Sequence, residues 1–131
     1  MKIVILDAYT THADDLNWDW LKPYGEYEIH DRTKVNDNAE IIERIGDANV
    51  IITNKAPISK EVMDACPNLK LVSVLATGYN IVDIDYAKEK GIVVCNVPAY
   101  STMSTSQYAI ALMLEMTNHI GLHNEAVHNG D

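Results

Sequence analysis

The fold is decided by the stretch Leu75-Ala76-Thr77-Gly78-Tyr79-Asn80-Ile81-Val82-Asp83. This stretch closes an apolar run that begins at Leu69, turns at a glycine and then starts a helix at an acidic residue. A strand that ends in a Gly-containing turn leaves backbone N–H groups free at its carboxyl end, where open α/β sheets bind anionic ligands. The pattern predicts an α/β fold with a carboxylate cradle at the turn. A plain strand-to-helix connection would show the same pattern.

Strands and helices alternate on both sides of this stretch. Runs of β-branched and apolar residues predict strands over residues 2–8, 27–30, 50–53, 69–76 and 91–97. Apolar spacing and capping residues predict helices over residues 13–21, 37–48, 59–66 and 83–90. A right-handed crossover helix is the usual connection between neighbouring parallel strands. We therefore expect a flavodoxin-like, doubly wound sheet of five parallel strands.

The pattern changes from Ser101 onward, where a long helix is predicted. The helix would have roughly five to six turns. Its apolar stripe consists of Ala109, Leu112, Met113, Met116 and Ile120. The neighbouring residues Ile110, Ala111 and Leu114 widen this stripe. A helix that is apolar over so wide an arc is expected to be buried on more than one side. A chain of 131 residues offers too little protein to cover it. We therefore expect the helix over residues 101–123 to contact another domain or a second copy of the chain, as in a homo-oligomer.

The composition excludes two classes of partner. The chain is long enough for one domain with a hydrophobic core, and its formal net charge is -9 at pH 7. Binding to nucleic acid or to an anionic membrane needs a basic patch, so we expect neither partner. No apolar run approaches the ~20 residues that span a bilayer, and the first apolar run is cut short by Asp7, unlike a signal peptide. These features favour a soluble, cytoplasmic protein.

The cysteines and histidines do not indicate a metal site. Cys66 and Cys95 belong to no Cys-x-x-Cys pattern, so each is expected to be a small, buried apolar residue. His119 and His123 have the i, i+4 spacing of a two-histidine site, but the sequence offers no obvious third ligand. We therefore predict no bound metal.

Three stretches in the second half of the chain carry a family resemblance. They are Thr77-Gly78-Tyr79-Asn80-Ile81-Val82-Asp83, Lys90-Gly91-Ile92-Val93-Val94-Cys95-Asn96-Val97-Pro98-Ala99-Tyr100-Ser101-Thr102 and Ser104-Thr105-Ser106-Gln107. In this order and spacing they resemble the D-isomer-specific 2-hydroxyacid dehydrogenases. The run from Asn96 to Thr102, with Gln107, is most similar to the glycerate dehydrogenase and hydroxypyruvate reductase branch.

The resemblance implies that two parts of the chain have different roles. Residues 1–99 would be the substrate-binding domain, and residues 100–131 the helix that in the family crosses into an NAD domain. The sequence contains no Gly-x-Gly-x-x-Gly, and the family's catalytic Arg, Glu and His have no counterparts in it. The chain is therefore expected to be a truncated NAD-dependent oxidoreductase, without catalytic residues or bound cofactor of its own and inactive alone. NAD and NADP are not distinguished.

The resemblance also assigns the substrate-binding residues. The family binds the carboxylate of a small 2-oxo or 2-hydroxy acid with backbone N–H groups at the turn that corresponds to Thr77, Gly78 and Tyr79. Main-chain donors approach an anion closely only where no side chain intrudes, which suits a glycine. Asn54 and Lys55 match a second substrate loop after the third strand. An ordinary turn and a solvated lysine are the alternatives.

Two further residues are matched in the last helix. Tyr100 corresponds to an aromatic residue beside the substrate, although a core or interface tyrosine would look the same in sequence. Thr105 corresponds to a position near the nicotinamide end of the cofactor. Around it Thr105-Ser106 replaces the commoner Val-Ala, and Met103 replaces a frequent acid.

Other functions fit the same fold class. A phosphoacceptor receiver would use Asp7 at the end of the first strand, but it also needs an aspartate at the end of the third strand, where this chain has Thr53-Asn54. The segment over residues 8–12 makes a poor phosphate loop for a flavin. A non-catalytic flavodoxin-like module that self-associates through the helix over residues 101–123 stays open.

Overall fold

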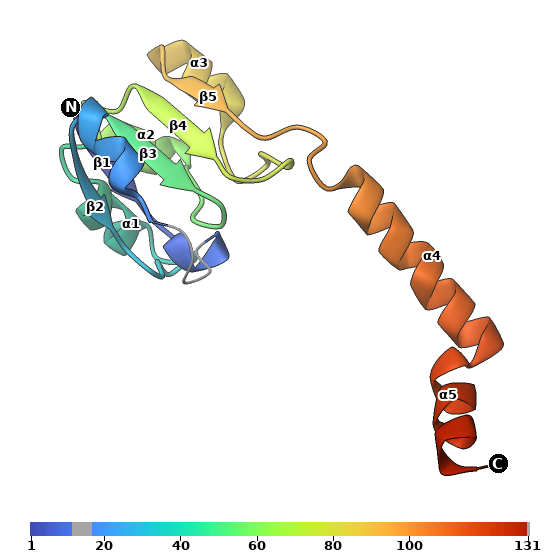
Figure 1. The fold of residues 1–131 in the computed structure, drawn as a ribbon. Coiled ribbons are helices and arrows are strands. Elements are labelled where there is room, and N and C mark those ends of the chain that lie inside the picture. Colours follow the sequence, from blue (N-terminus) through green and yellow to red (C-terminus); the bar gives the residue numbers. More distant parts are fainter. Residues whose placement is uncertain (12–16, 131) are drawn as a thin grey trace. The chain divides into compact units, whose positions relative to one another are not determined.

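The computed structural model describes residues 1–11 and 17–130 (Figure 1). The chain divides into two compact units, Met1–Pro98 and Ala99–Asp131. The elements of the first unit are, in chain order, β1 (Lys2–Ile5), η1 (Ala8–Thr10), η2 (Asp19–Tyr24), β2 (Glu26–Ile29), α1 (Asn38–Ile45), β3 (Val50–Thr53), α2 (Lys60–Ala65), β4 (Leu71–Val74), α3 (Ile84–Lys90) and β5 (Val93–Cys95), where η denotes a 3-10 helix.

The five strands form one parallel sheet, as the sequence predicts. Their order is β2-β1-β3-β4-β5, and every neighbouring pair is parallel. The connection after β1 leads to one edge of the sheet, and the connection after β2 passes back over β1 to reach β3. The winding direction therefore reverses between β1 and β3, which makes that position the topological switch point of the sheet.

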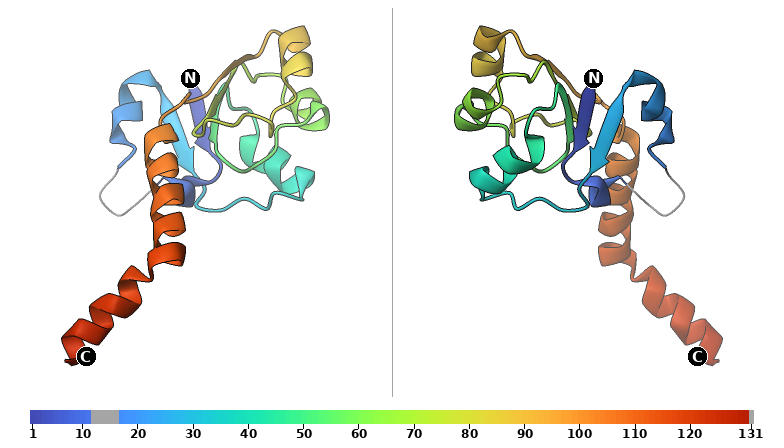
Figure 2. Two further views of the ribbon diagram at one scale, coloured as in Figure 1. Left: turned by 90° about the vertical axis from the view of Figure 1, so that its right-hand side faces the viewer. Right: turned by 90° about the vertical axis from the view of Figure 1, so that its left-hand side faces the viewer.

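The main hydrophobic core lies between the sheet and its three α-helices (Figure 2). Ile41 and Ile45 of α1 are fully buried against Ile51 of β3, and Val62 and Met63 of α2 belong to the same cluster. Helix α3 contributes one fully buried side chain, Ala87, with Tyr86 half-buried beside it. Because β3 lies in the middle of the sheet, its four residues are buried on both faces.

The opposite face of the sheet is covered by a smaller cluster around Ile5, Ile52 and Leu21. Leu21 belongs to η2, which overlaps the helix predicted over residues 13–21 only at residues 19–21. Residues 13–16 of that predicted helix lie outside the described residues. Of the described part, residues 17 and 18 are not helical, and the 3-10 helix begins at Asp19, extends to Tyr24 and includes Pro23.

Side-chain caps determine where the α-helices begin. The carboxylate of Asp37 accepts a hydrogen bond from the N–H of Glu40, and the carboxylate of Asp83 accepts one from the N–H of Tyr86. Such caps satisfy N–H groups that have no partner inside the helix. Helix α3 ends at Gly91, which adopts the left-handed conformation (φ 70°) that suits glycine.

The second unit contains two helices, α4 (Thr102–Asn118) and α5 (Ile120–Asn129), where the sequence predicts one continuous helix to residue 123. The break lies at His119, which adopts a left-handed conformation with φ 50°. Thr117 and Asn118 donate side-chain hydrogen bonds back to the carbonyl of Leu114, which competes with helix continuation. The Glu115 carboxylate then accepts from the N–H of Gly121 and caps α5.

Helix α4 has an apolar surface without a partner in its own unit. Among residues 102–118, all of which the structure describes, none is buried. Met103 and Met116 are among its most exposed residues, at 83% and 77%. Even so, no helix in the described part of the chain combines the length and hydropathy needed to cross a membrane.

Candidate functional site

The candidate site lies at the carboxyl edge of the sheet, where the loops after β3, β4 and β5 leave neighbouring strands. Backbone hydrogen bonds continue across this edge beyond the strands themselves. The N–H of Leu75 donates to the carbonyl of Thr53 at 2.8 Å, and the N–H of Val97 donates to the carbonyl of Ala76 at 3.1 Å. The three loops are therefore held side by side.

The turn after β4 has free donors at this edge. Within the described residues, the N–H groups of Thr77, Gly78 and Tyr79 have no hydrogen-bond acceptor. The turn is held instead through Thr77, whose carbonyl accepts from the Asn96 amide at 2.8 Å and whose hydroxyl donates to the carbonyl of Val97 at 3.0 Å. All three turn residues are exposed to solvent. Three exposed and consecutive N–H groups form a surface that can accept an anion.

The loop after β3 is organised around a different anion, the side chain of Asp7. The N–H groups of Asn54 and Lys55 donate to the Asp7 carboxylate at 2.8 and 2.5 Å, and the N–H of Ala56 donates to it at 3.0 Å. The Thr53 hydroxyl lies 3.1 Å from the same carboxylate. The backbone donors of the predicted substrate loop are therefore already used inside the protein. Only the side chains, half-buried at Asn54 and exposed at Lys55, remain for a ligand.

Asp7 was not among the predicted binding residues, although it is the most fully engaged polar group at this edge. It is 2% exposed and lies at the switch point between β1 and β3. The signal in the sequence is an acid that directly follows a buried-type strand. The same geometry argues against the phosphoacceptor hypothesis, because both carboxylate oxygens face N–H donors of the neighbouring loop.

Tyr100 and Thr105 belong to the second unit. Tyr100 is 65% exposed, and the N–H of Thr105 donates to the carbonyl of Ser101 at 2.8 Å at the start of α4. The site of the first unit is built without either residue. Their roles beside substrate and cofactor stay predictions.

A cavity of about 330 Å³ adjoins the turn on the side of α3. Tyr79 and Asn96 line it together with Ile84, Lys88, Ile92, Val94 and Cys95. The expectation of two buried cysteines is wrong for Cys95, which is exposed because β5 is an edge strand with an uncovered face. Cys66 is buried as expected, and burial raises the pKa of its thiol. Among the residues that the structure describes, no three His, Cys, Asp or Glu side chains group as a metal site would require.

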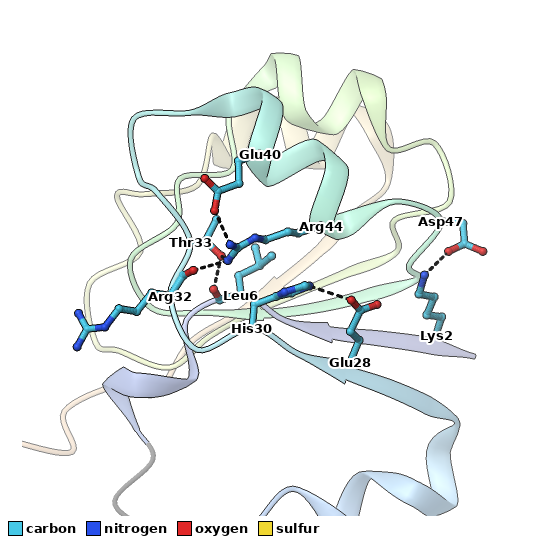
Figure 3. A network of polar contacts seen from close by, with 9 residues as sticks. All are labelled: Lys2, Leu6, Glu28, His30, Arg32, Thr33, Glu40, Arg44 and Asp47. Atoms are coloured by element: carbon cyan, nitrogen blue, oxygen red, sulfur yellow. Dashed lines mark hydrogen bonds and ion pairs between the residues drawn. The ribbon is translucent and has the colours of Figure 1, made fainter.

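A polar network holds the loop after β2 beside the same edge (Figure 3). Arg44 of α1 donates to the carbonyl of Arg32 and, at 2.8 Å, to the hydroxyl of Thr33, while its guanidinium pairs with Glu40. Thr33 in turn donates to the carbonyl of Leu6, the residue before Asp7. The network therefore joins α1 to the end of β1 and contributes to the position of Asp7.

His30 lies in this network and titrates with an altered pKa. Burial lowers the pKa of His30 below its ordinary value of 6.5, with a smaller opposing effect from the Glu28 carboxylate. The ring Nε2 is 3.2 Å from that carboxylate but is not aligned for a hydrogen bond. The unfolded chain therefore binds the proton more readily than the folded chain, so stability falls as the pH drops below 6.5.

We expect His30→Gln to reduce this loss of stability between about pH 7.5 and about pH 5.5. The measurement is the midpoint of thermal unfolding for the native chain and the variant across that range. His123→Gln, on exposed helix α5, is the control and is expected to leave the slope unchanged. An identical slope for His30→Gln and the native chain would show that other groups cause the pH dependence.

Comparison with known proteins places these features in a family. The model of the D-isomer specific 2-hydroxyacid dehydrogenase catalytic domain matches residues 3–130. The chain belongs to this family. Its members are oxidoreductases that act on CH–OH groups and depend on NAD.

Two named relatives in this family align with nearly the whole chain. It is 53% identical over 130 residues to a hydroxypyruvate reductase from Blautia hydrogenotrophica, and 31% identical over 130 residues to a glycerate dehydrogenase from Methylorubrum extorquens. The alignment covers 99% of this chain but 40% of each relative. This chain therefore spans about two fifths of the length of these family members.

Solved structures have the same architecture. An acyclic imino acid reductase, Bsp5, in complex with NADPH and D-Arg superposes with a TM-score of 0.81 at 25% identity, covering 100% of this chain and 42% of that one. The TT0316 protein from Thermus thermophilus superposes with a TM-score of 0.78 at 27% identity, covering 99% and 41%. The dehydrogenase-family fold is thus present within these residues.

The described residues of this family member do not fit the dinucleotide. Flavodoxin-like sheets bind a cofactor phosphate at the switch point, but here the backbone donors of that position already bind the carboxylate of Asp7. A phosphate there would meet a like charge. The sequence also lacks a Gly-x-Gly-x-x-Gly loop. We assign no chemical step to a cofactor held by these residues.

Proposed function

We propose that this chain is the substrate-carboxylate part of an NAD-dependent D-2-hydroxyacid dehydrogenase. In the reaction, a hydride passes reversibly between NAD(H) and a small 2-hydroxy or 2-oxo acid. Residues 1–99 act as the substrate-binding domain and residues 100–131 as the helix that leads toward the NAD domain. The observation that supports this proposal is the row of free N–H groups at Thr77, Gly78 and Tyr79.

The binding chemistry follows from the donors at the carboxyl edge. The free N–H groups of the turn orient the substrate carboxylate, and no side chain intervenes at Gly78. Lys55, exposed on the neighbouring loop, adds a positive charge on the same side of the sheet. In this proposal the Asn54 side chain donates a hydrogen bond to the substrate, and Tyr100 and Thr105 act beside the substrate and the nicotinamide. A 2-oxo acid such as hydroxypyruvate is the substrate class that the 53% identical relative supports.

The chain binds and orients the substrate but does not complete the reaction. Hydride transfer requires a bound dinucleotide and an acid–base group, and the cofactor carries the hydride when it is bound. The described residues offer neither a dinucleotide cradle nor a histidine paired with a carboxylate at the turn. We therefore propose that residues 1–131 alone bind a 2-oxo acid without turning it over.

A titration tests this proposal. On addition of glyoxylate to the isotopically labelled chain, the amide NMR signals of Thr77, Gly78 and Tyr79 are expected to shift, because their N–H groups donate hydrogen bonds to the carboxylate. A dissociation constant on the order of millimolar is expected for so small a ligand. Acetamide, which has a similar size but no charge, is the control and is expected to cause no shift at these positions.

Activity gives the second measurement. The purified chain with NADH and either glyoxylate or hydroxypyruvate is expected to show no oxidation of NADH above the rate without protein. Turnover by the chain alone would contradict the proposal that residues 1–131 bind a 2-oxo acid without turning it over. Unmoved signals at residues 77–79 would contradict the cradle.

We also propose that α4 mediates self-association. The helix has no buried residue, and its exposed apolar side chains include Leu112, Met113 and Met116. Continuous apolar surfaces of this kind on soluble proteins mark interaction sites. A second copy of the same helix supplies a matching apolar surface in a two-fold arrangement. If the chain does not bind a 2-oxo acid, self-association through α4 is the function expected of a non-catalytic flavodoxin-like module.

Light scattering coupled to size exclusion tests the self-association. The native chain is expected to have the mass of a dimer, and the double variant Leu112→Glu, Met116→Glu that of a monomer of 14.6 kDa. Thr102→Glu, at the exposed start of the same helix, is the matched control and is expected to remain dimeric. A native chain that is monomeric over a wide concentration range would overturn the proposal.

A further inference from the structure

The switch point of this sheet is occupied by a carboxylate of the protein itself, the side chain of Asp7. In open α/β sheets this crevice is where ligands bind. Here the residues from Thr53 to Ala56 direct three backbone N–H groups and a hydroxyl at the Asp7 carboxylate. The arrangement resembles the way such loops bind a phosphate or a carboxylate of a ligand. The ligand in this case is part of the protein.

We propose that Asp7 is the positioning residue of the substrate loop, and that it acts on the bound 2-oxo acid through Lys55. This inference rests on the proposed function. Asp7 itself is 2% exposed and does not reach the surface of the site, so it is not a catalytic residue. Its carboxylate fixes the backbone on either side of Lys55, whose own N–H makes the shortest of these contacts at 2.5 Å.

The geometry explains why this loop needs an anchor. Beyond β3, the backbone of the loop has no strand partner for the N–H groups of Asn54, Lys55 and Ala56 other than Asp7 among the described residues. Buried N–H groups without acceptors are costly, so the loop would rearrange if the carboxylate were lost. The Lys55 side chain would then sample many positions and contribute less to binding of a substrate anion.

Asp7 and the loop after β4, which lie on either side of this loop, are both held in place by hydrogen bonds. Asp7 follows β1, and the carbonyl of Leu6 is held by Thr33 within the network of Figure 3. The next loop is fixed to the same edge, because the N–H of Leu75 donates to the carbonyl of Thr53. The distance between the two loops is therefore set by the sheet, and the direction in which Lys55 leaves its loop is set by Asp7.

A double-mutant cycle tests the inference. Asp7→Asn replaces one acceptor oxygen with an NH₂ donor that faces N–H groups, at nearly unchanged size. We expect it to weaken glyoxylate binding about fivefold to tenfold, measured by the amide shifts of Thr77 and Gly78, and Lys55→Ala to weaken it by a similar factor. The double variant is expected to bind no more weakly than either single variant, since Asp7 acts through Lys55.

The outcomes separate this inference from the proposed function. Unchanged binding by Asp7→Asn, or effects that multiply in the double variant, overturns the positioning role while the cradle stands. A native chain that does not bind glyoxylate overturns the proposed function and, with it, the role of Asp7 in binding. Ile41→Val, a core change remote from the loop, controls for lost stability and is expected to bind like the native chain.

Hydrogen exchange reports on the loop directly. In Asp7→Asn the amides of Lys55 and Ala56 are expected to exchange at least about tenfold faster, with little change in the strands. If Asp7→Asn does not fold, Asp7→Ala provides the second variant, because formate can occupy the space of the missing carboxylate. Recovery of slow exchange or of folding by sodium formate, but not by sodium chloride, supports the inference. No difference between the two salts overturns it.

Discussion

Gly25→Ala is expected to lower the free energy of unfolding by about 3 kcal/mol, the larger part of it from a steric clash. Gly25 connects η2 to β2 with φ 149°, a backbone conformation that is open essentially to glycine alone. A Cβ atom built on it would lie 1.9 Å from the carbonyl oxygen of Met1. Since Met1 leads into β1, relief of the clash would disturb the pairing of Lys2 with Glu26.

Gly91→Ala is the matched control for this prediction. Gly91 also has a positive φ, 70°, but a Cβ atom there would have no neighbour within 4 Å. Its replacement is expected to cost only about 1 kcal/mol, from backbone strain. Chemical denaturation of both variants gives the comparison. Equal losses would mean that the Met1 backbone moves aside without cost.

Ile51→Ala is expected to destabilise the first unit by about 3–4 kcal/mol. Ile51 lies in the middle of β3, pairs with Val4 on one side and Val72 on the other, and is fully buried. Truncation leaves a cavity against α1 that the surrounding close-packed side chains fill only in part. A domain of this kind has roughly 5–15 kcal/mol of stability in total, so a large fraction would be lost.

Denaturant unfolding followed by circular dichroism measures this loss. Ile51→Val, which removes one methyl group, is the control and is expected to cost about 1 kcal/mol. Ile29→Ala, on edge strand β2 and 44% exposed, is expected to cost still less. A loss below about 1.5 kcal/mol for Ile51→Ala would show that the core closes around the truncated side chain.

The parallel sheet was predictable because most of its strands are short apolar runs that alternate with helices. The strand ends were less predictable. The apolar run from Leu69 to Ala76 is longer than β4, which covers only Leu71–Val74. Hydrophobicity shows which residues are buried, whereas the end of a strand depends on where its neighbours stop. Leu75 still donates to Thr53, but the chain beyond it has begun to turn.

The sequence predicted the residues of the turn after β4, but its prediction for the loop after β3 was incomplete because it missed Asp7. Gly78 signals a close approach of the backbone, and that information is local. The role of Asp7 depends on contacts with residues 46 to 49 positions away, which appear only when the strand order is known. The break at His119 was also missed, because the apolar stripe continues across it and the signal lies in the polar side chains of Thr117 and Asn118.

The position of β1 between β2 and β3 has a consequence for synthesis on the ribosome. Strand β1 is made before the four other strands of the sheet and lies between β2 and β3, and Asp7, which follows β1, finds its partners only when residues 53–56 have been made. Until then β1 has only β2 as a neighbour, and a charged group destined for the interior stays in water. The sheet can therefore close on both sides of β1 only after β3 has been made, and rare codons between β2 and β3 would prolong the period in which β1 has an unpaired edge.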